Sequence, residues 1–189
     1  MRSNLIRIFD ILISILTLLI SLPFIILVSF LIFAFDGKPI IFKQNRVGQY
    51  GKNFKILKFR TMKNVKKKNE IVRLTKVGII LRKLSFDEIP QFINILKNEM
   101  SVVGPRPLPS KYERKIIKSF RKKRRQVLPG LTGLSQINYK GKKRTLNDKV
   151  KLDVKFVENY SFIIYSKIII KTPIVLLIRL LKNKTSIIK

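Results

Sequence analysis

Apolar residues are most concentrated at the start of the chain, where no residue from Ile11 to Phe35 is charged. A helix of about 25 residues is about 37 Å long, which exceeds the roughly 30 Å hydrocarbon core of a bilayer. Pro23 lies near the middle of this run, where it removes a backbone donor and clashes with the preceding turn. Ser21 beside it can cap the freed backbone groups. Residues 1–36 are therefore predicted to form a proline-broken membrane helix.

The course of this helix has three interpretations. A secretory signal peptide would explain Arg2 and Arg7, but the apolar run is too long and no small-residue cleavage site follows it. A helix that turns back at Pro23 keeps both arginines on the side of the basic body, as the positive-inside tendency favours. An ordinary proline kink would instead leave a straight span. The pattern is compatible with the last two.

A second apolar segment, from Phe162 to Leu181, contains Lys167, Lys171 and Arg179. These basic residues return every four or eight positions, which places them on one helical face. Such a helix is expected to lie in the membrane interface, with its cations near lipid phosphates. The alternative is an amphipathic core helix with solvated lysines.

Between these segments the pattern predicts a β-hairpin. Its strands are expected at Pro39 to Lys43 and Asn53 to Arg60, separated by a turn that contains Gly48 and Gly51. The stretch from Lys63 to Asn69 is predicted to be a polar loop.

Two helices are predicted downstream of the hairpin. Ser85 and Glu88 have capping-box spacing, so a helix is expected to begin there and to continue through Leu96. The stretch from Ser110 to Glu113 repeats that spacing and is expected to open a basic helix through Arg125. The stretch 103–107 is expected to be a stiff loop, and the stretch 129–133 a turn-rich loop. The predicted fold is α+β and mostly helical, with residues 37–189 forming one body.

The charge of the chain requires an anionic partner. Forty-one Lys and Arg against ten Asp and Glu give a formal charge of +31, which suits phosphate, nucleic acid or acidic lipid alike. The absence of Cys and His excludes disulfides, thiolate nucleophiles, imidazole bases and Cys/His zinc sites. An enzyme of this composition must work with carboxylates, Lys, Arg, Tyr, Ser or Thr.

Asp87 and Glu88 are the only adjacent acids among the ten. They can be explained as helix-capping residues, because acids in a first turn complement free N–H groups and the helix dipole. A carboxylate can also attack phosphorus or hold Mg²⁺, which often takes only one or two protein carboxylates. Lys58, Arg82 and Arg106 are available as cations for phosphates. Spacing alone leaves both explanations open.

Four segments carry a family resemblance: KFRTM (58–62), LRKLSFDEIPQFINILKNEMSVVGPRPL (81–108), PGLTGLSQIN (129–138) and LDVKFVENYS (152–161). In this order they resemble the bacterial sugar transferase family, the monotopic phosphoglycosyl transferases that start glycoconjugate assembly. The chain is similar to the small, minimal members. The resemblance implies a re-entrant N-terminal helix and a catalytic domain at the cytoplasmic face of the bacterial inner membrane.

The resemblance also implies a chemistry. Asp87 would attack the sugar-linked phosphate of a nucleotide diphosphate sugar, expected to be a UDP-sugar, and release UMP. The phosphosugar would stay on Asp87 until polyprenyl (undecaprenyl) phosphate takes it. Glu88 would assist metal binding or proton removal, and both acids would contact Mg²⁺.

Arg82 would hold phosphate, and the turn formed by Pro105, Arg106 and Pro107 would shape the donor site. The expected partners are thus a UDP-sugar, polyprenyl phosphate and anionic membrane lipids, with no nucleic acid.

Two positions depart from the family pattern. Leu128 stands before Pro129 where an Arg is usual, and Tyr139 follows Asn138 where Gly is frequent. A scaffold that has lost activity is one alternative that Leu128 suggests. The other alternative, a membrane-tethered binder of nucleic acid or acidic lipid, fits the charge, but nothing in the chain resembles a defined nucleic-acid module.

Overall fold

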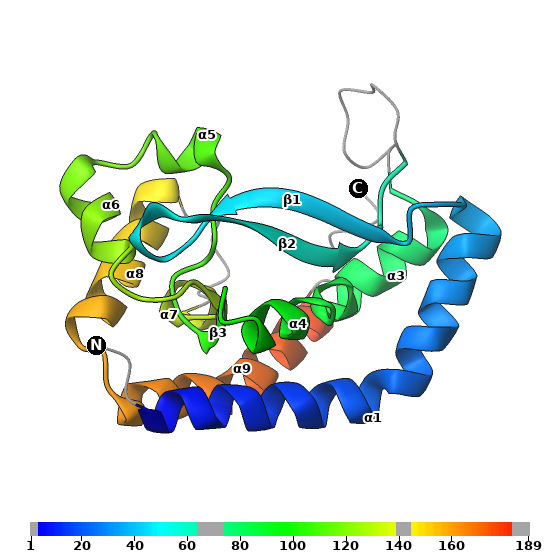
Figure 1. Cartoon of the computed structure of the whole chain (residues 1–189), viewed down its shortest axis with the longest axis horizontal. Coiled ribbons are helices and arrows are strands. Elements are labelled where there is room, and N and C mark those ends of the chain that lie inside the picture. The colour runs from blue at the N-terminus through cyan, green and yellow to red at the C-terminus, as the bar shows by residue number, and fades with distance from the viewer. Residues whose placement is uncertain (1–3, 64–73, 139–144, 183–189) are drawn as a thin grey trace.

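The computed structural model describes residues 4–63, 74–138 and 145–182, and it confirms a mostly helical α+β fold. Arg2, Tyr139 and nearly all of the predicted polar loop at 63–69 lie outside these ranges. Two small sheets accompany the helices: β1 pairs with β2, and β3 pairs with β4 (Figure 1). The helices are α1 (Asn4–Asp36), α3 (Lys76–Leu84), α4 (Gln91–Leu96), α5 (Ser110–Glu113), α6 (Lys118–Arg124), α7 (Leu134–Ile137), α8 (Leu146–Glu158) and α9 (Phe162–Lys182). The strands are β1 (Ile41–Val47), β2 (Asn53–Phe59), β3 (Ser101–Val103) and β4 (Gly130–Thr132).

Helix α1 is bent but not broken. It continues through Pro23, and Figure 1 shows its first half running beside α9 before the second half turns toward the end of the hairpin. The Ser21 hydroxyl donates to the Thr17 carbonyl at 2.6 Å, a back-bond that favours bending. This contact differs from the predicted one, because the carbonyl that Pro23 leaves without its usual donor is that of Leu19.

Both halves of α1 pack on the same body. Ile6 in the first half is buried in a core that includes Tyr165 of α9, and Ile32 in the second half is buried with Phe59 of β2. Among the described residues, α1 is the one helix long and apolar enough to cross a membrane. Its outward side is lined by large exposed apolar side chains: Leu12, Leu16, Leu19, Ile20, Ile26, Leu27 and Phe30.

The predicted hairpin is confirmed, with an extended first strand. The antiparallel register pairs Ile41 with Phe59 and Val47 with Asn53, so β1 begins later and ends later than the predicted 39–43. Gly51 closes the turn with a φ of +83°, a conformation that favours glycine.

The two loops predicted at 103–107 and 129–133 are corrected in part. Each overlaps a short strand, because β3 and β4 pair in parallel, with Ser101 opposite Gly130. The strands approach so closely that a Cβ on Gly130 would lie 2.0 Å from the Gly104 nitrogen. Small residues are therefore required where the two segments meet.

The basic helix predicted from Ser110 to Arg125 is divided. Helix α5 ends at Glu113 and α6 begins at Lys118, with an extended Ile117 between them. The predicted capping box is not formed, because Ser110 makes no cap contact and Glu113 is buried against two arginines. Glu113 thus makes ion pairs with Arg124 and Arg125 in place of the predicted contact with the helix N-terminus.

The predicted C-terminal helix is confirmed as α9, but its three basic residues behave differently. Lys167 and Lys171 are exposed, whereas the Arg179 guanidinium donates to the Gln136 carbonyl of α7. Arg179 therefore ties α9 to the body rather than lying free beside the two lysines.

A buried carboxylate joins three elements. Asp10 of α1 is fully buried, and its two oxygens accept hydrogen bonds from the Ser101 hydroxyl (2.8 Å), the Val102 amide (2.8 Å) and the Tyr165 hydroxyl (2.6 Å). These donors connect α1 to β3 and α9. Because an ionised group in an apolar core is costly unless it is hydrogen-bonded, this contact sets how α1 docks.

We expect Tyr165→Phe to destabilise the fold. The change removes one donor from a buried carboxylate, which costs about 1.5–3 kcal/mol and lowers the unfolding midpoint by roughly 3–12 °C. Thermal unfolding of the detergent-solubilised chain measures the effect. Tyr112→Phe is the matched control, since Tyr112 is 49% exposed; equal midpoints for the two variants would contradict the role of Asp10.

Candidate functional site

Asp87 and Glu88 lie in a short 3-10 turn, Phe86–Glu88, between α3 and α4. Helix α3 ends at Leu84, and the residue after it, Ser85, is left-handed (φ 59°) and makes no side-chain cap contact. The predicted capping box of Ser85 and Glu88 is therefore wrong. Pro90 stands directly before α4, where its missing N–H costs nothing. The turn presents both acids toward β2.

Lys58 of β2 bridges the two acids. Its Nζ lies 2.5 Å from Glu88 Oε1 and 3.6 Å from Asp87 Oδ2. The three side chains are largely buried, with 18% of Lys58, 10% of Asp87 and 20% of Glu88 exposed. A partly desolvated charge cluster of this kind interacts more strongly than a surface ion pair.

The two carboxyls are electrostatically different. Burial raises the pKa of Asp87 above its ordinary value, an effect that Lys58 opposes and the Glu88 charge reinforces. Burial also raises the pKa of Glu88, but the charges of Arg106 and Lys58 outweigh it, so that this pKa lies below its usual range. Divergent pKa values in neighbouring acids are typical of functional sites.

Arg82 acts on Asp87, and Arg106 pairs with Glu88. Arg82 of α3 is held by Thr61, whose hydroxyl accepts from Nε at 2.9 Å, and its charge lowers the pKa of Asp87. Arg106 lies 3.4 Å from Glu88 through its terminal nitrogen and is about half exposed. The structure thus brings the predicted cations to the predicted acids.

The turn that carries Arg106 is rigid. Pro105 and Pro107 are buried, and the Pro105 carbonyl accepts a hydrogen bond from the Gly130 amide at 2.9 Å. This bond extends the pairing of β3 with β4 into the turn. Arg106 therefore projects from a fixed backbone.

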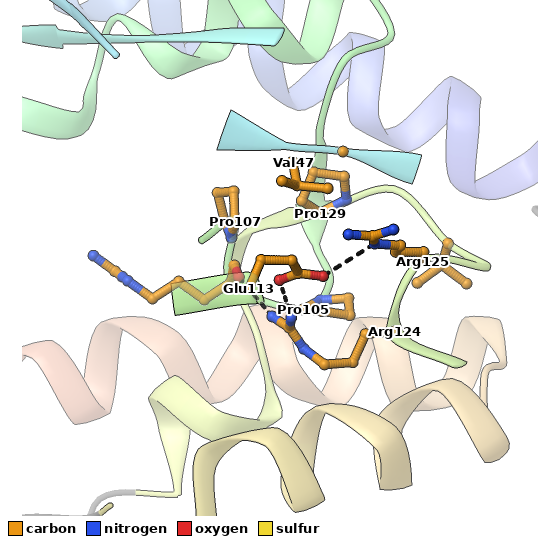
Figure 2. Close-up of a pocket in the computed structure, with 10 residues that line it drawn as sticks. Val47, Pro105, Pro107, Glu113, Arg124, Arg125 and Pro129 are labelled. Carbon is orange, nitrogen blue, oxygen red and sulfur yellow. Dashed lines mark hydrogen bonds and ion pairs between the residues drawn. The ribbon is translucent and has the colours of Figure 1, made fainter. Parts of the chain in front are cut away.

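A buried ion network supports the same turn from behind. Figure 2 shows the Glu113 carboxylate between Arg124 and Arg125, beside Pro105 and Pro107. Glu113 pairs with Arg124 at 2.9 Å and with Arg125 at 3.1 Å. Arg124 also donates to the Arg106 carbonyl at 2.8 Å and to Asp153 of α8 at 3.1 Å. Glu113, Arg124, Arg125 and Asp153 were not predicted as part of the site. The spacing of Glu113 from Ser110 was assigned to a helix cap.

A small pocket, open to solvent, lies beside Glu88. Sequence reasoning missed two of its polar residues, Arg46 of β1 and Gln91 of α4. Burial lowers the pKa of Arg46, and the nearby Arg106 charge lowers it further. The pocket is lined by Arg46, Ile56, Lys58, Glu88, Gln91, Arg106, Pro107, Gly130 and Leu131.

The acid pair fits the donor set of a Mg²⁺ ion with substrate ligands. Within residues 4–63, 74–138 and 145–182, no three acidic side chains gather at one point. Mg²⁺ commonly uses one or two carboxylates and completes its shell with water and phosphate oxygens. Asp87 and Glu88 offer two such groups and would be the residues to hold the ion, with the Lys58 ammonium beside both of them.

Leu128, which stands where the family usually has an arginine, lies in the interior of the protein. Its side chain is buried, and it is not among the residues that line the pocket beside Glu88. The arginines that line this pocket are Arg46 and Arg106.

Comparisons with known proteins identify the family of this chain. The family model for bacterial sugar transferases matches residues 1–179. An uncharacterised sugar transferase of Bacillus subtilis, EpsL, is 43% identical over 141 residues, which are 72% of this chain and 69% of EpsL.

Two relatives have names that state a reaction. The UDP-glucose:undecaprenyl-phosphate glucose-1-phosphate transferase of Klebsiella pneumoniae is 36% identical over 88% of this chain. The UDP-N-acetylgalactosamine-undecaprenyl-phosphate N-acetylgalactosaminephosphotransferase of Aeromonas hydrophila is 32% identical over 86% of it. The matched regions span 38% and 41% of these two proteins.

Proposed function

Because the chain belongs to the bacterial sugar transferase family, we propose that it transfers a sugar phosphate from a UDP-sugar to undecaprenyl phosphate. Family membership identifies it as a transferase. The names of relatives that act on UDP-glucose and UDP-N-acetylgalactosamine support the donor and the acceptor. The observation that carries the proposal is the Asp87–Glu88 pair, held beside Lys58 and flanked by Arg82 and Arg106.

In the first step, an oxygen of Asp87 bonds to the phosphorus that carries the sugar. The bond from that phosphorus to the bridging oxygen breaks, and this oxygen leaves with the electron pair as part of UMP. Phosphoryl transfer depends mainly on positioning and on neutralising charge over the phosphate oxygens. Lys58, Arg82 and Arg106 supply that charge.

In the second step, an oxygen of undecaprenyl phosphate attacks the same phosphorus. The bond to Asp87 breaks, the carboxylate is restored, and the product is an undecaprenyl diphosphate sugar. A covalent intermediate lets a soluble donor and a lipid acceptor use one site in turn.

Glu88 is assigned to electrostatic support rather than to proton removal. A carboxyl whose pKa is held low is a weak base. Bound Mg²⁺, for which Asp87 and Glu88 are the proposed ligands, would neutralise charge on the phosphate oxygens.

We further propose that α1 enters one leaflet of the bacterial inner membrane and returns to the cytoplasmic face. Ile6 and Ile32, in its two halves, are both buried against the body, which a straight span would not allow. The exposed apolar side of α1 then lies in lipid, and Lys167 and Lys171 of α9 lie near anionic headgroups.

We expect Asp87→Asn to abolish UMP release. Membranes that contain the protein are supplied with Mg²⁺, undecaprenyl phosphate and a panel of UDP-sugars. Loss of the nucleophile should lower the rate by at least about 10³-fold, while Asp148→Asn, at an exposed helix cap, retains activity. Without the lipid acceptor, the parent should release about one UMP per protein and retain labelled sugar phosphate. An Asp87→Asn variant as active as the parent contradicts the mechanism; no UMP from any sugar favours a scaffold or a binder.

The pH dependence of UMP release should reveal the raised pKa of Asp87. Asp87 acts when ionised, so activity falls as the pH drops through its pKa. Lys58 is the strongest cationic influence that lowers this pKa. Lys58→Met therefore should raise it further and move the acid limb of the profile to higher pH. Lys55→Met, an exposed residue of the same strand, should leave the limb in place; an unmoved limb in Lys58→Met would refute the assignment.

Single cysteines test the course of α1, because the chain has no other cysteine. Asn4→Cys and Lys38→Cys stand near the two ends of the helix and are both exposed. In oriented membrane vesicles, a membrane-impermeant maleimide should label both from the same side. Labelling from opposite sides would instead establish a straight span.

A further inference from the structure

We propose that Gln91 and Arg46 complete an anion subsite that binds the diphosphate oxygens of the nucleotide donor. The proposal rests on the proposed function for the identity of the donor. The subsite is the pocket beside Glu88, and it assigns substrate contacts to two residues outside the predicted set.

Gln91 lines this pocket, and its side-chain amide nitrogen is a buried hydrogen-bond donor. The residue is 2% exposed, and its Nε2 makes no hydrogen bond of ordinary geometry within the described part of the chain. A side-chain hydrogen bond from the amide to Glu88 helps to lower the pKa of that carboxyl, and this contact engages at most one of the two N–H groups of Nε2. A buried unsatisfied donor is costly, so its persistence calls for a ligand that accepts from it.

Arg46 brings a second donor of the same kind. One terminal nitrogen donates to the Pro107 carbonyl at 3.2 Å and the other to Gln44 at 2.6 Å, which fixes the guanidinium at the pocket wall. Its Nε is buried and, among the described residues, has no hydrogen-bond partner. Gln91 of α4 and Arg46 of β1 thus line the same pocket, and each has a side-chain N–H group that is not satisfied.

The charge of the pocket selects an anion. Its charged lining residues are the cations Arg46, Lys58 and Arg106 and the single acid Glu88, a balance of three to one. Cations this close repel one another, as the lowered pKa of Arg46 beside Arg106 reflects after its burial. A neutral sugar would leave that repulsion in place, whereas a diphosphate would relieve it and accept from both free donors.

Asn94 supplies an internal comparison, because it is a buried amide one turn further along the same helix. It is 1% exposed, and its oxygen accepts from the Leu57 amide at 3.0 Å. Its nitrogen donates to the Lys55 carbonyl at 2.9 Å and to Glu99 at 2.6 Å. Asn94 therefore has a complete structural role, whereas Gln91 does not.

The experiment compares Gln91→Met with Asn94→Leu in the detergent-solubilised full chain. Binding of inorganic pyrophosphate is measured by titration calorimetry without added metal, and unfolding is followed thermally. Gln91→Met should weaken pyrophosphate binding about tenfold, with an unchanged or higher unfolding midpoint. Asn94→Leu should lower the midpoint by roughly 4–10 °C and leave the Kd of pyrophosphate within about twofold.

A second variant guards against misfolding of the first. Gln91→Glu preserves the side-chain shape but adds a negative charge, and it should weaken pyrophosphate binding more than Gln91→Met does. The subsite is refuted if the parent does not bind pyrophosphate, or if Gln91→Met and Gln91→Glu lower the midpoint without changing the Kd.

Kinetics separates this proposal from the transferase assignment. If the parent binds pyrophosphate but releases no UMP from any UDP-sugar, the transfer reaction fails and the subsite stands. If Gln91→Met keeps the parental KM and kcat for the UDP-sugar, the subsite fails and the transfer reaction stands.

Discussion

The arrangement of the site depends on one buried carboxylate, Asp10, in a mostly apolar helix. Asp10 must be satisfied by donors from the body, and it finds them on β3 and on Tyr165 of α9. Strand β3 leads directly into the turn of Pro105 and Arg106. The same hydrogen bonds that dock α1 therefore fix the strand from which Arg106 reaches Glu88. Strand β3 thus links the proposed membrane helix to the proposed catalytic site.

The buried network around Glu113 holds the other side of that turn. Arg124 donates to the Arg106 carbonyl while it pairs with Glu113 and Asp153, so α8 and the α5–α6 segment both bear on it. An arginine on a mobile turn would lose backbone entropy as well as side-chain entropy on binding phosphate. Fixing its backbone from two directions reduces that cost. The buried charges of Glu113, Arg124 and Asp153 therefore help to position Arg106.

Local patterns predicted the hairpin, the helices at both ends and the acid pair, because each has a short-range signature. The errors came from contacts between distant residues. Glu88 has the spacing of a helix cap, but Lys58 of β2 engages it instead. Arg46 was missed because its side of the hairpin depends on how the two strands pair. It pairs with Phe54, which places it on the same face as Lys58. No spacing rule identifies Gln91, whose signal is a donor left unpaired by the tertiary fold.

The opposite pKa shifts of Asp87 and Glu88 follow from where the cations stand. Glu88 has Lys58 at 2.5 Å and Arg106 at 3.4 Å, so attraction overcomes burial and the acid stays a weak base. Asp87 is further from Lys58, at 3.6 Å, and it also feels the negative charge of Glu88, so burial prevails and its carboxylate becomes more basic. A more basic carboxylate is the better nucleophile toward phosphorus, and the more firmly ionised one is the better permanent charge. Geometry thus divides the proposed roles of two chemically similar neighbours, and removing Arg106, which of the pair acts on Glu88 alone, would bring their pKa values closer together.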